Sequence, residues 1–177
     1  MSTAPRYIPH YTLADYQQWE GDWELWDGIP VAIPRHFAPH QICALKVMCS
    51  LLRLTESAKC QAVVVPAIDW IISDDTVVRP DILLLCGDVP EEHVTRPPAL
   101  IVEIISPATA ERDRNQKCKL YEENGVDYYL IVHPNNRTIE AYRRNAQGDF
   151  ESFDPAGESE FAVCDDCRIR WDVMSSF

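Results

Sequence analysis

Two acidic residues that stand inside strand-like apolar segments have the clearest chemical potential in this chain. Asp81 follows Pro80 in the run 77–85, and Glu103 lies in the run 99–107, both rich in Val, Ile and Leu. Removing a carboxylate from water in such a segment is costly unless a cation compensates it. Two carboxylates on consecutive strands therefore predict a shared divalent cation. Mg²⁺, or Mn²⁺ in its place, takes oxygen ligands and keeps several waters, so Asp81 and Glu103 can suffice as protein ligands.

A cation held by these carboxylates has a definite chemistry, because it can polarise a phosphodiester oxygen and activate a bound water. Such a reaction also needs a positive group near the developing charge. The helix predicted over 109–124 offers Lys117 and Lys119, which face different sides because they are two positions apart. At four-residue spacing Asp113, Lys117 and Tyr121 share one polar stripe. Lys117 and Lys119 are thus both candidate cations, and Lys117 shares its stripe with the further candidate site residues Asp113 and Tyr121.

The elements that must position these residues follow from periodicity and turn signals. Residues 23–33 alternate around Asp27-Gly28, which predicts a β-hairpin carrying Glu24. Apolar residues repeat at helical spacing from Pro39 to about Leu54, so His40 stands at a helix start. Further strands are predicted at 61–65, 69–72, 77–85, 100–105, 126–132 and 138–142, with weaker ones near 150, 161–164 and 168–171. The sum is one α/β domain over 1–177, with a mixed central β-sheet flanked by helices.

In this order the motifs resemble a bacterial family of PD-(D/E)xK endonucleases once catalogued as a domain of unknown function. The resemblance spans roughly residues 12–145 and adds a glutamate-bearing hairpin followed by a histidine, here Glu24 and His40. The segments that carry it are Arg79–Asp81, Val102–Pro107, Arg112–Asp113, Lys117, Tyr121 and Gly125–Leu130. It implies a restriction-endonuclease-like fold with Asp81 and Glu103 as metal ligands, and a Mg²⁺-dependent endonuclease that hydrolyses DNA.

One position departs from the superfamily pattern, which has a lysine two residues after the glutamate. Here that position is Ile105, so the resemblance requires the lysine to have moved, and Lys117 is the best substitute. The missing lysine keeps a second hypothesis open, in which the chain is a catalytically inactive nuclease-fold module for binding or regulation. A third hypothesis treats the acidic residues as a structural ion-pair network in an unrelated α/β protein.

The charge of the chain limits how it can bind DNA. A formal net charge of −12 requires any phosphate-binding surface to concentrate Lys and Arg locally. Arg112, Arg114 and Lys119 form the clearest such segment and are the predicted DNA contacts. Because cutting both strands of a duplex favours two-fold symmetry, a homodimer is expected.

Cysteine usage and hydropathy favour a cytoplasmic protein. No apolar run has the length of a membrane span, and residues 1–6 lack the apolar core of a signal peptide. The seven cysteines are odd in number and scattered, several in apolar segments, which is typical of reduced and buried thiols. Cys164 and Cys167 form a lone CxxC, which without a second pair favours an incidental or structural pair over a zinc site.

Overall fold

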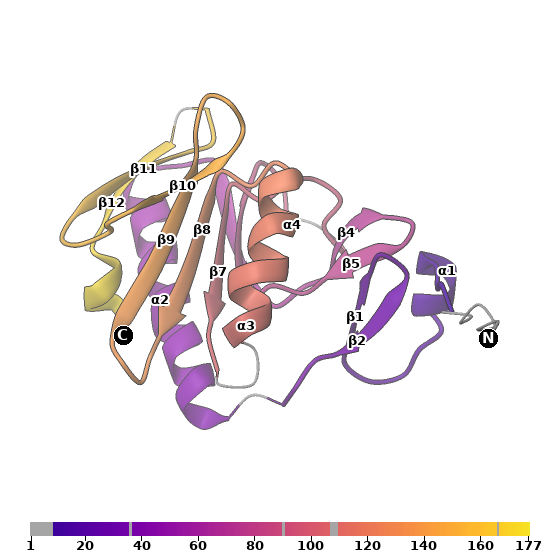
Figure 1. Ribbon diagram of the computed structural model, residues 1–177. Helices are drawn as coiled ribbons and strands as arrows, with labels where there is room; N and C mark the ends of the chain where they lie inside the picture. Colours follow the sequence, from indigo (N-terminus) through magenta and orange to yellow (C-terminus); the bar gives the residue numbers. More distant parts are fainter. Residues whose placement is uncertain (1–8, 36, 90, 107–109, 166) are drawn as a thin grey trace.

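The computed structural model describes residues 9–35, 37–89, 91–106, 110–165 and 167–177. Its centre is a mixed sheet in the order β10-β9-β8-β7-β6-β3, in which β7 and β8 run parallel and the other neighbours are antiparallel. The predicted mixed α/β fold with a central sheet is confirmed (Figure 1). The six strands are β3 (Ala62–Pro66), β6 (Ile82–Cys86), β7 (Leu100–Ile104), β8 (Tyr128–His133), β9 (Thr138–Arg144) and β10 (Phe150–Phe153).

Different elements cover the two faces of this sheet (Figure 1). One face packs against α2 (Ala38–Ser57), the hairpin of β11 (Ser159–Val163) and β12 (Cys167–Trp171), and the 3₁₀ turn η2 (Val173–Ser176). The other face packs against a helical segment made of α3 (Ala110–Arg112), η1 (Asp113–Lys117) and α4 (Cys118–Glu123). We call this segment the site helix. The two layers bury the sheet on both sides, which is why its central strands are almost wholly apolar.

The alternation of side chains along β7 determines which face of the sheet Glu103 occupies. Leu100, Val102 and Ile104 contribute to the core on the α2 side, whereas Ile101 and Ile105 contribute to the core under the site helix. Side chains alternate between the faces of a strand. Glu103 therefore faces the site helix, in line with two buried isoleucines.

A smaller sheet in the order β2-β1-β5-β4 lies beside the central one (Figure 1). Its strands are β1 (Trp23–Trp26), β2 (Ile29–Ala32), β4 (Trp70–Ser73) and β5 (Thr76–Val78), and the short helix α1 (Leu13–Tyr16) precedes them. The predicted hairpin is confirmed: Asp27 and Gly28 both have positive φ, 47° and 74°, as a type I′ turn requires. A Cβ at Gly28 would also collide with the exposed ring of His10, which would have to move, and the positive φ by itself favours glycine there.

The run 77–85 is not the single strand that its apolar residues predict. It divides into β5, in the small sheet, and β6, in the central sheet, and Arg79, Pro80 and Asp81 form the break. Pro80 has no backbone N–H and cannot donate to a ladder. Asp81 consequently lies immediately before the first residue of β6 and not inside a strand.

The predicted helix over 109–124 is also irregular. Its predicted first residue lies outside the described residues, and Asp113–Lys117 forms a π-helical turn between two α-helical pieces. A π turn closes i→i+5 hydrogen bonds and inserts a residue relative to an α-helix. The four-residue stripe is therefore wrong as a regular α-helical feature, although Asp113, Lys117 and Tyr121 are all buried against the sheet.

Four of the seven cysteines are disulfide-bonded, so for these the expectation of reduced thiols is wrong in this structure. Cys60 pairs with Cys167, and Cys86 pairs with Cys164. Cys43, Cys49 and Cys118 are free. An apolar neighbourhood in sequence cannot distinguish a buried thiol from a bridged one, because the partner lies 78 or 107 residues away.

Among the residues that the structure describes, no helix has the length and apolar character needed to cross a membrane.

Candidate active site

Glu103 is the centre of a buried ionic cluster between the central sheet and the site helix. Its Oε1 accepts hydrogen bonds from Lys117 Nζ at 2.8 Å and from the Tyr121 hydroxyl at 2.7 Å. Glu103, Lys117 and Tyr121 are 3%, 4% and 0% exposed. The ammonium and the phenol thus fix one carboxylate oxygen from two successive turns of the site helix.

Glu24 brings a second carboxylate to the same ammonium from the small sheet. Its Oε1 lies 3.1 Å from Lys117 Nζ and accepts a 2.8 Å hydrogen bond from the backbone N–H of Arg79. The Arg79 side chain is directed elsewhere, because its guanidinium pairs with Asp69 at 2.7 Å and Asp22 at 3.1 Å. Glu24 Oε2 is buried without a hydrogen-bond partner among the described residues.

Asp81 completes the cluster at the point where β6 and β7 begin to pair. Its Oδ2 accepts a 2.8 Å hydrogen bond from the backbone N–H of Ile104 and lies 3.1 Å from His40 Nε2. The Asp81 backbone N–H in turn donates to Glu103 Oε2 at 3.4 Å. His40 reaches this point from the first turns of α2, so residues from both faces of the sheet meet at its end.

A small cavity of about 20 Å³ lies among these side chains, which is room for about one water molecule or ion. Glu24, Asp81, Glu103, Asp113 and Lys117 line it, together with Ile33, Arg79, Ile104 and Arg112. Oxygen donors converge here on a volume suited to a single small cation.

Burial and neighbouring charges shift the pKa values of the residues in this cluster. Burial raises the pKa of the Glu103 carboxyl well above its usual range; Lys117 opposes this rise and Asp81 adds to it. Burial alone would lower the pKa of Lys117, but the carboxylates of Glu103, Glu24 and Asp113 outweigh it and raise that pKa. The ammonium therefore stays charged.

Asp81 responds in the opposite way to Glu103. Burial alone would raise its pKa, but the hydrogen bond and charge of His40 and the Ile104 amide hold the pKa of Asp81 below its ordinary value. Asp81 is thus held as a carboxylate beside a neighbour whose ionisation is opposed. Two carboxyl groups with separated pKa values are typical of functional sites.

The residues fit a hard divalent cation. Glu24 and Glu103 share the Lys117 ammonium, and Glu24 Oε2 accepts no hydrogen bond from the described residues. A cation ligated by Asp81 and Glu103 would relieve both features, because hard cations take carboxylate oxygens. In the described part of the chain, no group of three or more His, Cys, Asp or Glu side chains is arranged around a metal position, so these carboxylates and bound water would have to share the coordination.

The other predicted residues are not all in the cluster. Ile105, at the usual lysine position, is buried in the apolar core below the site helix, and Lys117 brings an ammonium to Glu103 from the helix instead. Arg112 lines the cavity and lies 5.5 Å over the Trp26 ring. Arg114 pairs with Glu140 at 2.7 Å, and Lys119 is exposed and lies 3.5 Å from Glu123.

Sequence reasoning missed the backbone groups that hold the carboxylates. The N–H groups of Arg79, Asp81 and Ile104 each donate to a site carboxylate. Every residue except proline has a backbone N–H, so residue types do not reveal which of these groups bind a carboxylate. The one related signal in the sequence was Pro80, which interrupts the strand pairing between β5 and β6.

Comparisons with known proteins identify the family and the fold of the chain. Residues 13–169 match the model of the Uma2 family, described as "Putative restriction endonuclease". An uncharacterized protein of Synechocystis sp. (strain ATCC 27184 / PCC 6803 / Kazusa) is 25% identical over 150 residues, which cover 81% of this chain and 79% of that protein.

The fold has a solved counterpart as well. A crystal structure from Anabaena variabilis ATCC 29413, titled a putative nuclease belonging to DUF820, superposes with a TM-score of 0.69 at 16% identity, covering 84% of this chain and 87% of that one. The match between this chain and the family model extends over most of its length and includes every cluster residue. The chain belongs to the Uma2 family, the family described as putative restriction endonucleases.

Proposed function

We propose that this chain is a Mg²⁺-dependent endonuclease, with Mn²⁺ as the alternative cation, that hydrolyses phosphodiester bonds in DNA. The observation that carries the proposal is the trio of half-buried Asp81 and buried Glu103 and Lys117 around a cavity of ion size. A structural ion pair needs one carboxylate for each ammonium. Here Glu24 and Glu103 share the single ammonium of Lys117, and a further cation would stabilise these buried carboxylates.

Asp81 and Glu103 are the proposed metal ligands, and Glu24 is a possible third. When bound, the cation would polarise a phosphodiester oxygen and activate a water for attack. His40 and the Ile104 amide hold the Asp81 carboxylate in place, while Tyr121 holds Glu103. These contacts restrict the carboxylates to one arrangement before substrate arrives.

Lys117 supplies the positive charge that the reaction requires. Its ammonium lies within hydrogen-bonding distance of Glu103 and Glu24, and its pKa is raised, so it remains protonated. A fixed ammonium in a water-poor site stabilises charge that develops on a phosphoryl oxygen. We assign this role to Lys117, with the carboxylates as its positioning partners.

DNA would approach along the groove beside the site. This groove has a volume of about 430 Å³ between the β1–β2 hairpin and the site helix, and its lining includes Trp26, Arg112, Gln116 and Lys119. Arg112 borders both the groove and the ion-sized cavity. Arg112 and Lys119 are therefore proposed phosphate contacts, and Arg114 is a third on the same segment.

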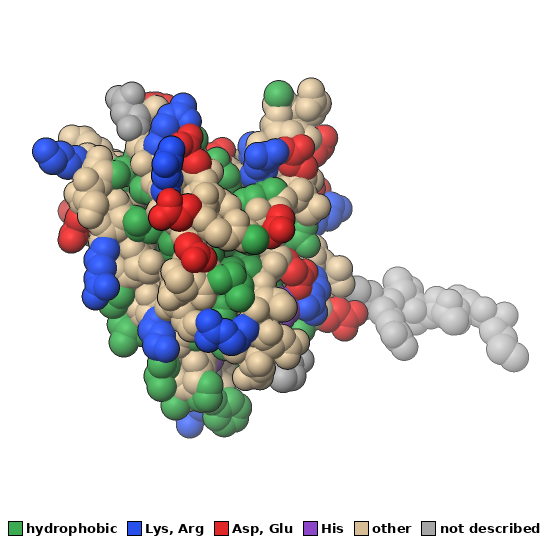
Figure 2. Space-filling model, turned by 90° about the vertical axis from the view of Figure 1, so that its left-hand side faces the viewer, with side chains coloured by type: hydrophobic (Ala, Val, Ile, Leu, Met, Phe, Trp, Pro, Cys, Tyr) green, Lys and Arg blue, Asp and Glu red, His purple; other side chains and the backbone are tan. Residues whose placement is uncertain are grey.

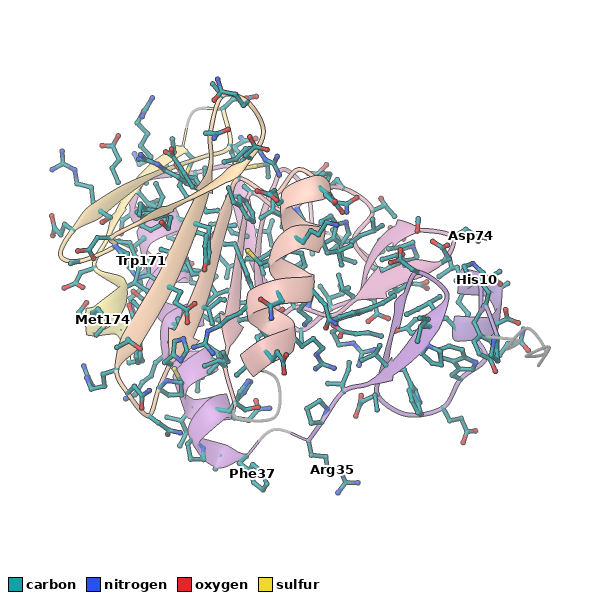
Figure 3. The ribbon with its side chains drawn as sticks, in the orientation of Figure 1. His10, Arg35, Phe37, Asp74, Trp171 and Met174 are labelled. Atoms are coloured by element: carbon teal, nitrogen blue, oxygen red, sulfur yellow. A yellow bond between two sulfur atoms is a disulfide. The ribbon has the colours of Figure 1, made fainter. Side chains whose placement is uncertain are left out.

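A homodimer is part of the proposal. The start of α2, next to His40, exposes apolar side chains: Phe37 is 82% exposed, Ile42 55% and Leu45 56%. Hydrophobic side chains gather at the lower tip of the molecule in Figure 2, at the height where α2 begins in Figure 1, and Phe37 points away from the body in Figure 3. A second copy bound here would place two sites near each other. For an enzyme acting on cellular DNA we also propose a cytoplasmic location.

One observation favours a non-catalytic binding module instead. Ile105 replaces the usual lysine and packs into the apolar core, and Lys117 is already engaged with two carboxylates. In that case the fold would bind DNA without cutting it.

The test is a metal-dependent cleavage assay on plasmid and single-stranded DNA. We expect cleavage with Mg²⁺ or Mn²⁺ and none with a chelator. Asp81→Asn should lower the rate by roughly 10³-fold, as the loss of a central catalytic group does, whereas Asp74→Asn, an exposed aspartate in the small-sheet region, should not. Asp81→Asn retaining full activity would exclude this site as the source, and DNA binding without cleavage would favour the binding module.

A further inference from the structure

The four disulfide-bonded cysteines form a single group, although they come from four separate positions in the chain. Cys86 ends β6, and its cross-strand partner in β3 is Ala62, two residues after Cys60. Cys60 and Cys86 therefore share one face of the sheet. That face is the α2 side, where all four cysteines join one apolar cluster.

The C-terminal hairpin contributes the other two cysteines from its turn. Cys167 begins β12 and pairs in register with Val163, so Cys164 is the first residue of the turn; its φ is +58°. The bonding is crosswise. Cys167 reaches Cys60 with Cα atoms 5.1 Å apart, and Cys164 reaches Cys86 with Cα atoms 5.5 Å apart. Each cysteine of the CxxC thus bonds a different cysteine at the β3–β6 edge of the sheet, so the two disulfides join the same hairpin turn to the same edge.

In the oxidised state the described residues form no metal-binding group, and these four sulfurs are bonded in pairs. Reduction would give the CxxC what it lacked in the sequence, a second pair of sulfur ligands. Four cysteines, two of them in a C-x₂-C turn, are the donor set of structural zinc sites. Zn–S bonds of about 2.3 Å place tetrahedral sulfurs roughly 3.8 Å apart, so after reduction the two sulfurs of each pair would separate and the two pairs would close around one ion.

We propose that, when the two disulfides are reduced, Cys60, Cys86, Cys164 and Cys167 bind one Zn²⁺ as a tetrahedral structural site. A dithiol supplies the electrons: each disulfide takes two electrons and two protons, and each dithiol becomes a disulfide. The four thiols then release four protons as they form four Zn–S bonds. Four protein ligands leave no open position, so the ion would have no catalytic role.

The site would fasten the C-terminal hairpin to the central sheet. Phe161, Ile169 and Trp171 of this hairpin are buried against α2 and the sheet, and Trp171 Nε1 donates to Ser50 Oγ on α2 at 3.1 Å. Figure 3 labels Trp171 on this side of the molecule. In a reducing compartment disulfides do not persist, and zinc would keep the same four positions joined. The inference does not depend on the proposed function.

The experiment reduces the full chain anaerobically with a phosphine, which adds no thiol ligand, and titrates it with Co²⁺ as a spectroscopic probe and then with Zn²⁺. We expect one equivalent of Co²⁺ to produce the sulfur-to-cobalt charge-transfer and tetrahedral visible bands, and Zn²⁺ to displace it. Zn²⁺ should also protect four thiols from a thiol reagent. Cys164→Ser and Cys60→Ser should lose the bands, whereas Cys49→Ser, which removes a free cysteine, should keep them.

Asp81→Asn should keep the bands as well, because the carboxylate site has oxygen ligands only. Wild-type protein that shows no charge-transfer band after reduction would overturn the proposal without any variant. Bands that persist in both Cys164→Ser and Cys60→Ser would also overturn it, as would cobalt bound only through oxygen.

Discussion

The two ends of strand β6 present opposite kinds of chemistry. Asp81 immediately precedes the strand and lies among carboxylates, an ammonium and backbone N–H groups. Cys86 ends the strand and lies among sulfurs and apolar side chains. Oxygen donors select hard cations such as Mg²⁺, and thiolates select Zn²⁺. A strand of five residues therefore separates a proposed catalytic site from a fastening site, and the two should respond independently.

The largest effects should come from substituting one proposed ligand in each region and measuring both cleavage and cobalt binding. Glu103→Gln keeps the shape of the side chain but removes a proposed metal ligand, so cleavage should fall by roughly 10³-fold. Its sulfur-to-cobalt bands after reduction should match wild type. Cys86→Ser should behave in reverse, losing the bands and keeping cleavage within a few-fold. If either substitution impaired both readouts equally, the two regions would not be independent.

Lys117 tests whether the carboxylate end needs its ammonium. Lys117→Met leaves Glu24 and Glu103 buried without their cation, which costs about 3–5 kcal/mol of unfolding free energy. Cleavage should also fall by roughly 10²-fold. Urea denaturation and the cleavage assay measure the two effects.

Lys119→Met is the matched control, because Lys119 is exposed on the same helix and its ion pair with Glu123, at 3.5 Å, is on the surface. Its unfolding free energy should change by less than about 1 kcal/mol. Equal, small effects of the two substitutions on stability and cleavage would show that the Lys117 ammonium contributes no more than that of an exposed lysine, and would contradict its assigned role.

Magnesium should stabilise the protein more at high pH than at low pH. The folded-state pKa of Glu103 is raised, so its contribution to metal-free stability is present below the unfolded pKa and is lost as pH rises through the folded value. Mg²⁺ binds the ionised form, so the rise in Tm on adding Mg²⁺ should grow from about pH 5 to about pH 9. Thermal unfolding with and without Mg²⁺ measures it, and Glu103→Gln should flatten the dependence. A wild-type Mg²⁺ effect independent of pH would contradict the assignment.

The smallest effect should come from the basic residues outside the ionic cluster. Lys119→Ala or Arg114→Ala should weaken DNA binding uniformly across sequences and reduce the slope of log K against log salt by about 1. Binding titrations at several salt concentrations measure this slope. Arg168→Ala, on the C-terminal hairpin, is the control, and an equal change there would mean that the site helix is not the DNA-facing surface.

Local pattern was enough to predict most elements and the acidic residues of interest. The alternation around Asp27-Gly28 determined the first hairpin, and the apolar run around Glu103 determined β7. These signals are local because a type I′ turn and a buried strand each depend on residues within a few positions. The run 77–85 misled because a buried strand and two short strands have the same composition. The break at Pro80 became clear only from the structure, in which β5 and β6 belong to different sheets.

The surroundings of each chemical group were decided by tertiary structure. The sequence determined that Asp81, Glu103 and Lys117 are present, but the approach of Glu24 and His40 depends on packing among the small sheet, α2 and the central sheet. The same holds for the cysteines, since Cys164 and Cys167 looked like a lone pair until the hairpin brought them to Cys86 and Cys60. Residue types fix which ligands and charges a chain can offer. Their grouping requires contacts across tens of residues, which the packing of β-sheets and helices selects and no local pattern encodes.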